Sequence, residues 1–315
     1  MLGFNKLEAW ATKTKFMNVN GSVKKGVVIS FGVFDGVHVG HQALIQRMLK
    51  QASELEMETV VLTFDPHPAL STSGVAPPSI TTIEKKIELL KTQGVSRIVV
   101  EDFNEEFSQL SPEEFVHDIL LGKLNAQEIV VGYDCAFGKN RAGDKWLLKK
   151  LGENYGAVVE IVEPYNLHGE VVSSTRVRNA IQKGDLDLAN ILLGRLYSIS
   201  GTVVSGKGIG KKIGYATANL QTKNEVLPPL GVYAVKVYVN EQLFNSILNM
   251  GVQPTMGDGE FRIEAHIIDF EGKLYGHCME IFFVKKIRDE RVFASPKDLV
   301  EQIEKDELIA REILG

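Results

Sequence analysis

Two histidines three positions apart, His38 and His41, have the side chains and the spacing best suited to chemistry on a phosphate. They follow an apolar, β-branched run at 27–29 and a glycine-containing turn, and they precede apolar residues at helical spacing. The sequence therefore predicts that both imidazoles share one face of a helix N-terminus, at the carboxyl end of a buried strand. Backbone N–H groups and the helix dipole favour an anion there, Gly40 permits close approach, and the imidazoles can donate hydrogen bonds as charge builds in a transition state.

Two other interpretations of this histidine pair stay open from the four residues alone. The pair could be half of a metal site, although metal-binding pairs are more often four positions apart and need a third ligand. It could also be two surface histidines that meet by chance. The preceding strand and the following helix favour phosphate binding, which depends on positioning and charge stabilisation and needs no nucleophile from the protein.

The segment at 32–45 (GVFDGVHVGHQALI) resembles the signature of the nucleotidyltransferase superfamily. More narrowly, the chain is similar to the prokaryotic bifunctional riboflavin kinase/FAD synthetase family. Later motifs that carry the same resemblance are 131–138 (VGYDCAFG), 173–178 (SSTRVR), 216–219 (ATAN) and 249–255 (NMGVQPT). The resemblance implies that residues 1–194 adenylylate FMN to FAD, releasing pyrophosphate, and that residues 195–315 phosphorylate riboflavin to FMN with ATP.

The motif at 173–178 supplies a second set of phosphate-binding groups. Ser174 and Thr175 open a predicted helix, so their hydroxyls and the backbone N–H groups can hold a phosphate. Arg178 lies one turn further on, and its guanidinium suits a leaving pyrophosphate. Alone, the motif would be an ordinary Ser/Thr helix cap with surface arginines; together with the two histidines, in this order, it indicates ATP binding.

Two loops at strand ends are expected to face the flavin. The resemblance implies that His67, in a stiff Asp-Pro-His-Pro loop, lines the flavin side of the pocket, and that Asp134 contacts nucleotide or flavin. Cys135 stands where the family usually has Phe. Lys139 and Arg141 either meet phosphates or form a solvated basic turn, and the sequence does not favour one over the other.

Glycines at 206, 208 and 210 form a loop that could cradle phosphate in the second half of the chain. The pattern is weak by itself, and because no βαβ unit follows it, the dinucleotide-binding interpretation fails. Gly206, Gly208 and Gly210 could instead form a flap that cradles the phosphates of ATP.

The motif at 216–219 is similar to the Pro-Thr-Ala-Asn motif of riboflavin kinases, which implies that Thr217 and Asn219 complete a Mg²⁺ shell. Ala216 replaces the usual proline, which could loosen that metal site. The resemblance also makes Glu264 the base that accepts the riboflavin hydroxyl proton and places Arg288 and Phe293 near the flavin. On its own, Glu264 would be one more outward-facing strand carboxylate.

The elements that must position these residues change character along the chain. Up to Gly194, apolar strands alternate with helices, which predicts an α/β domain with a doubly wound parallel sheet, with a capping box at 81–84 opening one helix. From Arg195, β alternation predicts an antiparallel barrel, and a long helix begins at Ser295. The barrel strands are expected at 196–204, 231–240, 243–249, 262–270 and 279–287.

Composition limits the function classes. A length of 315 residues suggests two domains, and a net charge of −5 argues against nucleic-acid binding. The two cysteines, far apart in sequence, fit a reducing cytoplasm, and the sequence contains neither a signal-peptide pattern nor an apolar run that would span a membrane. The expected partners are riboflavin, FMN and ATP, with self-association left open.

Two alternative functions stay open. An FMN adenylyltransferase with an impaired kinase half would follow if Ala216 disables the metal site. A flavin-binding regulatory protein with decayed catalysis is disfavoured by the intact motifs. The barrel disfavours an adenylyltransferase acting on another phosphate ester.

Overall fold

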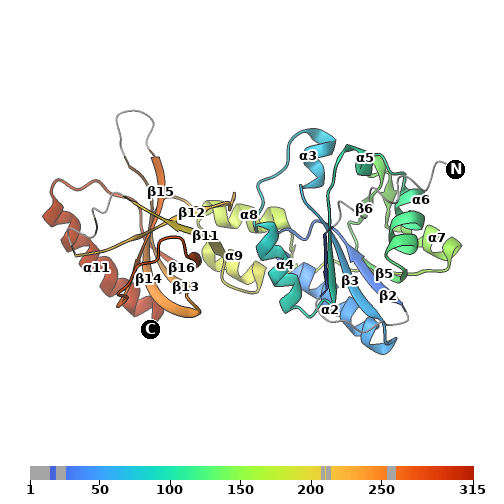
Figure 1. The fold of residues 1–315 in the computed structure, drawn as a ribbon, viewed down its shortest axis with the longest axis horizontal. Helices are drawn as coiled ribbons and strands as arrows, with labels where there is room; N and C mark the ends of the chain where they lie inside the picture. The colour runs from blue at the N-terminus through green and yellow to red at the C-terminus, as the bar shows by residue number, and fades with distance from the viewer. Residues whose placement is uncertain (1–14, 19–25, 207–209, 211–213, 254–259) are drawn as a thin grey trace. The chain divides into compact units, whose positions relative to one another are not determined.

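The computed structural model describes residues 15–18, 26–206, 210, 214–253 and 260–315, which form two compact units (Figure 1). The first unit holds the chain up to Pro78 and residues 82–173, and the second holds residues 79–81 and 174–315. Across these ranges, every helix is too short or too polar to cross a bilayer.

The first unit is built on a sheet with the strand order β1-β4-β3-β2-β5-β8. β1 is antiparallel to β4, and the other neighbours pair in parallel. The strands are β1 (Lys15–Asn18), β2 (Val27–Phe31), β3 (Glu58–Phe64), β4 (Arg97–Glu101), β5 (Ala126–Gly132) and β8 (Val158–Val162). The predicted doubly wound parallel sheet is confirmed. Its strand order reverses between β2 and β5, so the loops that follow these strands flank the crevice where such sheets bind ligands.

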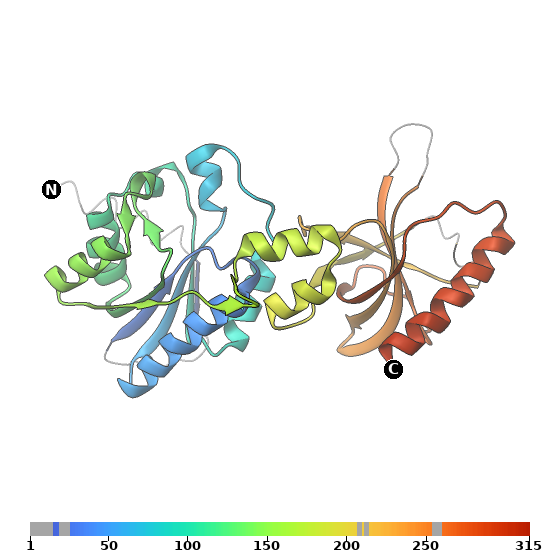
Figure 2. The same cartoon turned by 180° about the vertical axis from the view of Figure 1, so that it is seen from behind.

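Helices cover both faces of this sheet. On one face, α2 (Val39–Glu54), which Figure 2 shows running along the sheet, and α4 (Ile83–Thr92) bury their apolar sides in one core cluster. On the other, η2 (Phe115–Lys123), a π-helix, and α7 (Lys145–Tyr155) pack in a second cluster. The shorter elements are η1 (Asp35–Val37), α3 (Pro68–Ser73), α5 (Glu105–Ser108), α6 (Pro112–Glu114), β6 (Ala136–Phe137), η3 (Lys139–Arg141), β7 (Gly143–Asp144), β9 (Asn166–Leu167) and β10 (Glu170–Val171).

Helix starts follow from local side-chain chemistry. The Ser111 hydroxyl accepts from the Glu114 N–H at 3.2 Å while the Ser111 N–H donates to the Glu114 carboxylate at 2.8 Å, a complete capping box. The capping box predicted at 81–84 is wrong. Thr82 is the N-cap of α4 and accepts from the Lys85 N–H, so Glu84 lies one position too early to close a box.

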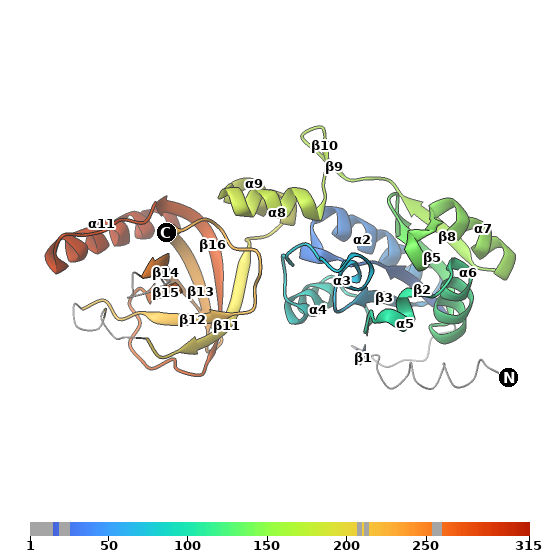
Figure 3. The ribbon, with the colours of Figure 1, turned by 90° about the horizontal axis from the view of Figure 1, so that it is seen from above.

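The second unit centres on a closed antiparallel barrel with the strand order β11-β12-β15-β14-β13-β16. Its strands are β11 (Ser198–Val204), β12 (Ala218–Thr222), β13 (Gly231–Val239), β14 (Gln242–Gln253), β15 (Glu260–Ile267) and β16 (Cys278–Arg288). The barrel is confirmed, but β12 was missed, because its segment was interpreted only as a metal-binding motif. The C-terminal helix α11 (Pro296–Leu314) lies along the outside of the barrel (Figure 3), where Ala310 and Leu314 pack on Val232 and Ile247.

Two further helices, α8 (Ser174–Lys183) and α9 (Leu186–Leu193), belong to the second unit. The Asn190 side chain ties α9 to the barrel: its Oδ1 accepts from the Tyr197 N–H at 2.6 Å, and its Nδ2 donates to the Phe283 carbonyl at 3.4 Å.

Candidate functional site

The histidine pair forms the start of α2, at the carboxyl end of β2. His38 is the N-cap, and its Nδ1 accepts a hydrogen bond from the His41 backbone N–H at 3.3 Å. The two rings stack with centroids 3.7 Å apart and an interplanar angle of 15°. Among the described residues, the His41 Nδ1 is enclosed and has no hydrogen-bond partner. The predicted placement of both imidazoles at a helix N-terminus is confirmed.

Gly40 lies close beneath the His38 ring of the stack. A Cβ at this position would come within 3.2 Å of the Cε1 and Nδ1 atoms of the His38 ring. The loop before it is strained, since Phe34 has φ 50° and Val37, a β-branched residue, has φ 41°. Strained backbone of this kind concentrates where a protein holds a ligand in a fixed geometry.

His41 is held in its neutral form. Burial is the largest cause that places its pKa well below the ordinary value, followed by the neighbouring His38 and the ammonium of Lys86. A neutral imidazole keeps one N–H donor, so His41 can still bind a phosphate oxygen without carrying a charge.

Lys86 is the residue near this pair that the sequence analysis missed. It lies in the first half of α4 and is 6% exposed. Burial lowers the pKa of its ammonium, an effect partly offset by the carboxylates of Asp35 and Asp65. The signal was present, because Lys86 occupies the apolar stripe of its helix, three residues after Ile83 and four before Leu90.

The loops after β3 and β5 hold the other candidates of the first unit. His67 is the N-cap of α3, and its Nδ1 accepts from the Ala69 N–H at 3.1 Å. Asp134 is exposed in the turn that follows β5. Burial raises the pKa of the neighbouring Cys135 thiol to about 12, so this thiol stays protonated and is a packing group.

The Ser-Ser-Thr segment opens a helix as predicted, since α8 begins at Ser174. Arg178 is 8% exposed and Thr175 is exposed. These three residues belong to the second unit, whereas the histidine pair belongs to the first.

A row of directly paired residues crosses the barrel and gathers the candidates of the second unit. Asn219 of β12 pairs with Glu264 of β15, which pairs with Asn249 of β14. Asn249 pairs with Val232 of β13, and Val232 pairs with Arg288 of β16. Residues directly opposite on antiparallel strands point to the same face, so this polar row shares the face that Val232 turns towards α11.

The glycine loop lies over the 217–219 motif. A Cβ on Gly206 would come within 2.3 Å of the Asn219 Nδ2, and a Cβ on Gly210 would lie 2.2 Å from the Tyr215 carbonyl oxygen and 3.5 Å from the Thr217 hydroxyl. A side chain at Gly210 would therefore collide with backbone, whereas one at Gly206 would have to displace the Asn219 side chain. Gly208 lies outside the described residues.

The carboxyl group of Glu264 is shifted from its ordinary pKa. Burial is the first cause that raises the pKa of its carboxyl group, and the nearby Arg262 partly lowers it. The oxygens of Thr217 and Asn219 lie on the same segment, beside Glu264, and form the hard-donor environment that Mg²⁺ prefers. Within the described ranges, no group of three or more His, Cys, Asp or Glu side chains could hold a metal, so a metal here would take most ligands from phosphate and water.

The segment around Ala216 is held by a histidine. The His266 Nδ1 lies 2.9 Å from the Ala216 carbonyl oxygen, and its ring meets the Tyr215 ring edge-on at 5.1 Å. These two contacts hold the backbone of the motif at Ala216, where the proline usual in the family is replaced by alanine.

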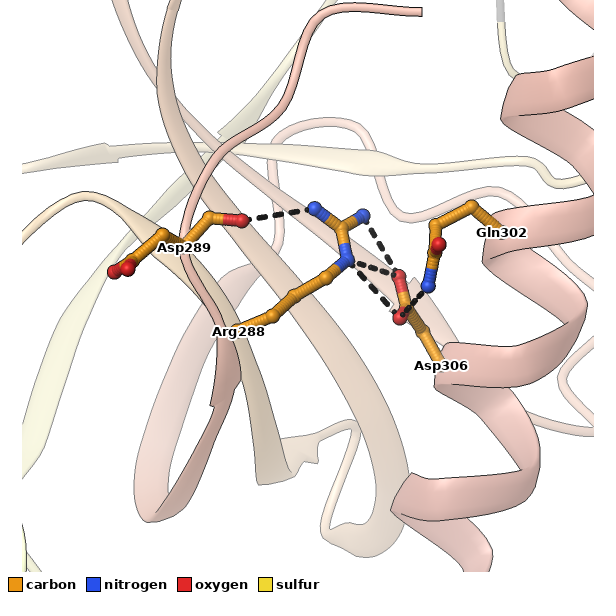
Figure 4. Close-up of polar contacts among 4 residues, drawn as sticks. All are labelled: Arg288, Asp289, Gln302 and Asp306. Carbon is orange, nitrogen blue, oxygen red and sulfur yellow. Dashed lines mark hydrogen bonds and ion pairs between the residues drawn. The ribbon is translucent and has the colours of Figure 1, made fainter.

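Arg288 is tied to the C-terminal helix (Figure 4). Its Nε donates to both carboxylate oxygens of Asp306 at 3.0 and 3.1 Å, and its Nη2 donates to Oδ2 at 2.8 Å. Gln302 donates to the same carboxylate at 2.9 Å, and the Arg288 Nη1 donates to the Asp289 carbonyl at 3.0 Å. The guanidinium carbon lies 5.7 Å from the Phe293 ring centre. Arg288 is therefore fixed in place by the carboxylate, and its guanidinium already contacts the Phe293 ring.

Comparisons with known proteins agree along nearly the whole chain. The family model for FAD synthetase matches residues 21–176, and the one for riboflavin kinase matches residues 193–314. The bifunctional riboflavin kinase/FMN adenylyltransferase of Pseudomonas fluorescens is 38% identical over 91% of this chain and 93% of its own, and that of Bacillus subtilis is 39% identical over 89% and 90%. The crystal structure of a macrolide-efflux protein from Streptococcus pneumoniae aligns with a TM-score of 0.83 at 32% identity, covering 92% of this chain and 95% of that one.

Proposed function

The chain belongs to the family of bifunctional riboflavin kinase/FMN adenylyltransferases, and we propose that it divides the two reactions between two separate sites. It is a transferase that phosphorylates riboflavin to FMN with ATP and adenylylates FMN to FAD. The proposed adenylyltransferase domain spans residues 1–194 and the proposed kinase domain residues 195–315. The stacked histidine pair at the start of α2 is the observation that supports the first site best.

In adenylyl transfer, the FMN phosphate is already a nucleophile, so the protein has to position and neutralise charge. We assign His38 and His41 to the α-phosphate of ATP, with Gly40 allowing the phosphate to approach the helix start. Ser174, Thr175 and Arg178 are assigned to the pyrophosphate that leaves, an assignment that rests on the motif match. His67 and Asp134 are assigned to the flavin side on the same grounds.

In riboflavin phosphorylation, Glu264 is the proposed base. Burial raises the pKa of the Glu264 carboxyl group towards neutral pH. Asn219 and Asn249 lie directly opposite Glu264 on the two neighbouring strands. Gly206 and Gly210, with Gly208 between them, are assigned to the ATP phosphates, and Arg288 to the flavin. Thr217 and Asn219 would hold Mg²⁺, which supplies charge neutralisation at the phosphates when bound.

The remaining assignments concern binding partners and cellular location. We propose a cytoplasmic protein that acts on riboflavin, FMN and ATP and that binds neither nucleic acid nor membrane, with self-association left to measurement. The net charge of −5 and the absence of a paired-cysteine pattern support this. Macrolide efflux, the role in the name of the S. pneumoniae structure, does not fit the two family models that match this chain, which are those of FAD synthetase and riboflavin kinase.

Chromatography of flavins tests the proposed function. The protein is incubated with ATP and Mg²⁺, starting from riboflavin in one tube and from FMN in another. FAD in both tubes supports both activities and makes Ala216 a tolerated change. FAD from FMN alone would replace the proposal by an adenylyltransferase with an impaired kinase. Flavin binding without ATP turnover would favour a regulatory flavin-binding protein.

A further inference from the structure

Lys86 is a buried cation that the structure leaves without a direct partner. The side chain is 6% exposed, yet within the described part of the chain its ammonium forms neither a hydrogen bond nor an ion pair. Burying an unpaired charge is costly, and most buried lysines are paired. The ammonium is also not among the fully enclosed unpaired polar atoms of the described residues, so it keeps some exposed surface.

The position of α4 turns this side chain towards the histidine loop. Ile83 and Leu90, three residues before and four after Lys86 and so on the same face of the helix, pack in the core cluster that contains Phe34 and Val37 of that loop. The Lys86 charge acts on His41, and it is acted on by Asp35 and by Asp65. Asp35 follows β2 and Asp65 follows β3, so Lys86 faces the carboxyl ends of these two strands.

We propose that Lys86 is a further catalytic residue of adenylyl transfer, with its ammonium donating to an oxygen of the reacting phosphates in front of His38 and His41. The inference rests on the proposed function of the first site. It explains why a charge is kept in the apolar stripe of α4: the phosphates, which carry several negative charges, complete a pair that the protein alone leaves open. It also explains how the site keeps a positive charge for the phosphates although His41 is neutral, since Lys86 supplies that charge near His41.

The proposed step leaves Lys86 protonated. An oxygen of the FMN phosphate attacks the α-phosphorus of ATP and forms the new P–O bond. The bond between the α-phosphorus and the bridging oxygen breaks, and pyrophosphate leaves with that electron pair. Lys86 donates hydrogen bonds throughout, and its contribution is greatest where negative charge accumulates on the α-phosphoryl oxygens.

The test replaces Lys86 by Met, which keeps the length of the side chain and removes the charge. FAD formation from FMN and FMN formation from riboflavin are measured on the same full-length protein, together with its melting profile. A matched control makes the same change at Lys91, at the end of α4. We expect Lys86→Met to lower kcat for FAD formation at least a hundredfold, to leave FMN formation unchanged and to leave the melting temperature equal or higher, and we expect Lys91→Met to change neither rate.

The outcomes separate the possibilities. If the wild type makes FAD and a folded Lys86→Met protein makes it within threefold of that rate, the inference is overturned while the proposed function stands. If the wild type makes no FAD, both fail. If Lys86→Met unfolds the first unit, Lys86→Arg and Lys86→Gln are compared at a temperature below their transitions: a tenfold or greater advantage for Arg supports the inference, and equal rates overturn it.

Discussion

Replacing Asp306 by Asn should destabilise the second unit strongly, because the change leaves a poorly hydrated guanidinium without its counter-charge. The side chains of Asp306 and Arg288 are 2% and 13% exposed, and three N–H···O contacts of 2.8, 3.0 and 3.1 Å join them. Removing one partner of such a buried pair costs about 3–5 kcal/mol. For a unit of this size, that loss corresponds to a fall in melting temperature of about 10 °C.

The same helix offers a matched control. Arg311 also binds an aspartate with two N–H···O contacts, but its partner Asp269 is 75% exposed and Arg311 is 44% exposed. Exposed pairs contribute little to stability, because water already solvates both charges. Asp269→Asn should therefore move the melting temperature by no more than about 2 °C.

Calorimetry of the full-length protein can measure both variants. Equal shifts for Asp306→Asn and Asp269→Asn would refute the assignment of a buried, structurally essential pair. A third variant checks the cause: Asp306→Leu combined with Arg288→Met should recover most of the lost stability, because removing both charges leaves no buried ion unpaired.

Three further predictions concern the sites themselves. Glu264→Gln should lower FMN formation by about 10²–10⁴-fold and spare FAD formation from FMN. Because the raised pKa of Glu264 makes its charged form unfavourable in the folded state, the stability that this carboxyl group contributes is present at low pH and is lost as pH rises through that pKa. The variant should therefore also melt at a higher temperature than the wild type above neutral pH. His41→Ala should stop FAD formation and leave FMN formation intact, and an equal loss of both in folded protein would contradict the domain assignment. Because the pKa of His41 is lowered in the folded state, the first unit should lose stability as pH falls below about 6.5, where the unfolded chain takes up a proton, and His41→Gln should remove this part of the dependence in melting curves against pH. Gly206→Ala should reduce FMN formation by about tenfold without affecting FAD formation, because its methyl group would displace the Asn219 side chain. Equal rates of FMN formation in both proteins would contradict the importance of the Asn219 position for this reaction.

Local chemistry determined most of what the sequence could predict. The histidine pair lies at a helix start because a buried strand, a glycine turn and an amphipathic segment follow one another within thirty residues. Local sequence patterns also predicted the change from alternating strands and helices to barrel strands. They predicted the start of α11 at Ser295 as well, where the capping box is complete. Each signal depends on neighbours along the chain.

The tertiary structure decided what depends on residues far apart. Asn219, Glu264 and Asn249 meet because the barrel closes with one register, and periodicity cannot reveal which strand pairs with which. Lys86 is buried because α4 packs on the histidine loop, although lysine is normally a surface residue. Arg288, expected at the flavin, is held by Asp306, a contact that exists only because α11 folds back along the barrel. In each case the free energy that favours the contact comes from desolvation and pairing between segments far apart in the chain. The residues next to each segment in the sequence do not reveal these contacts.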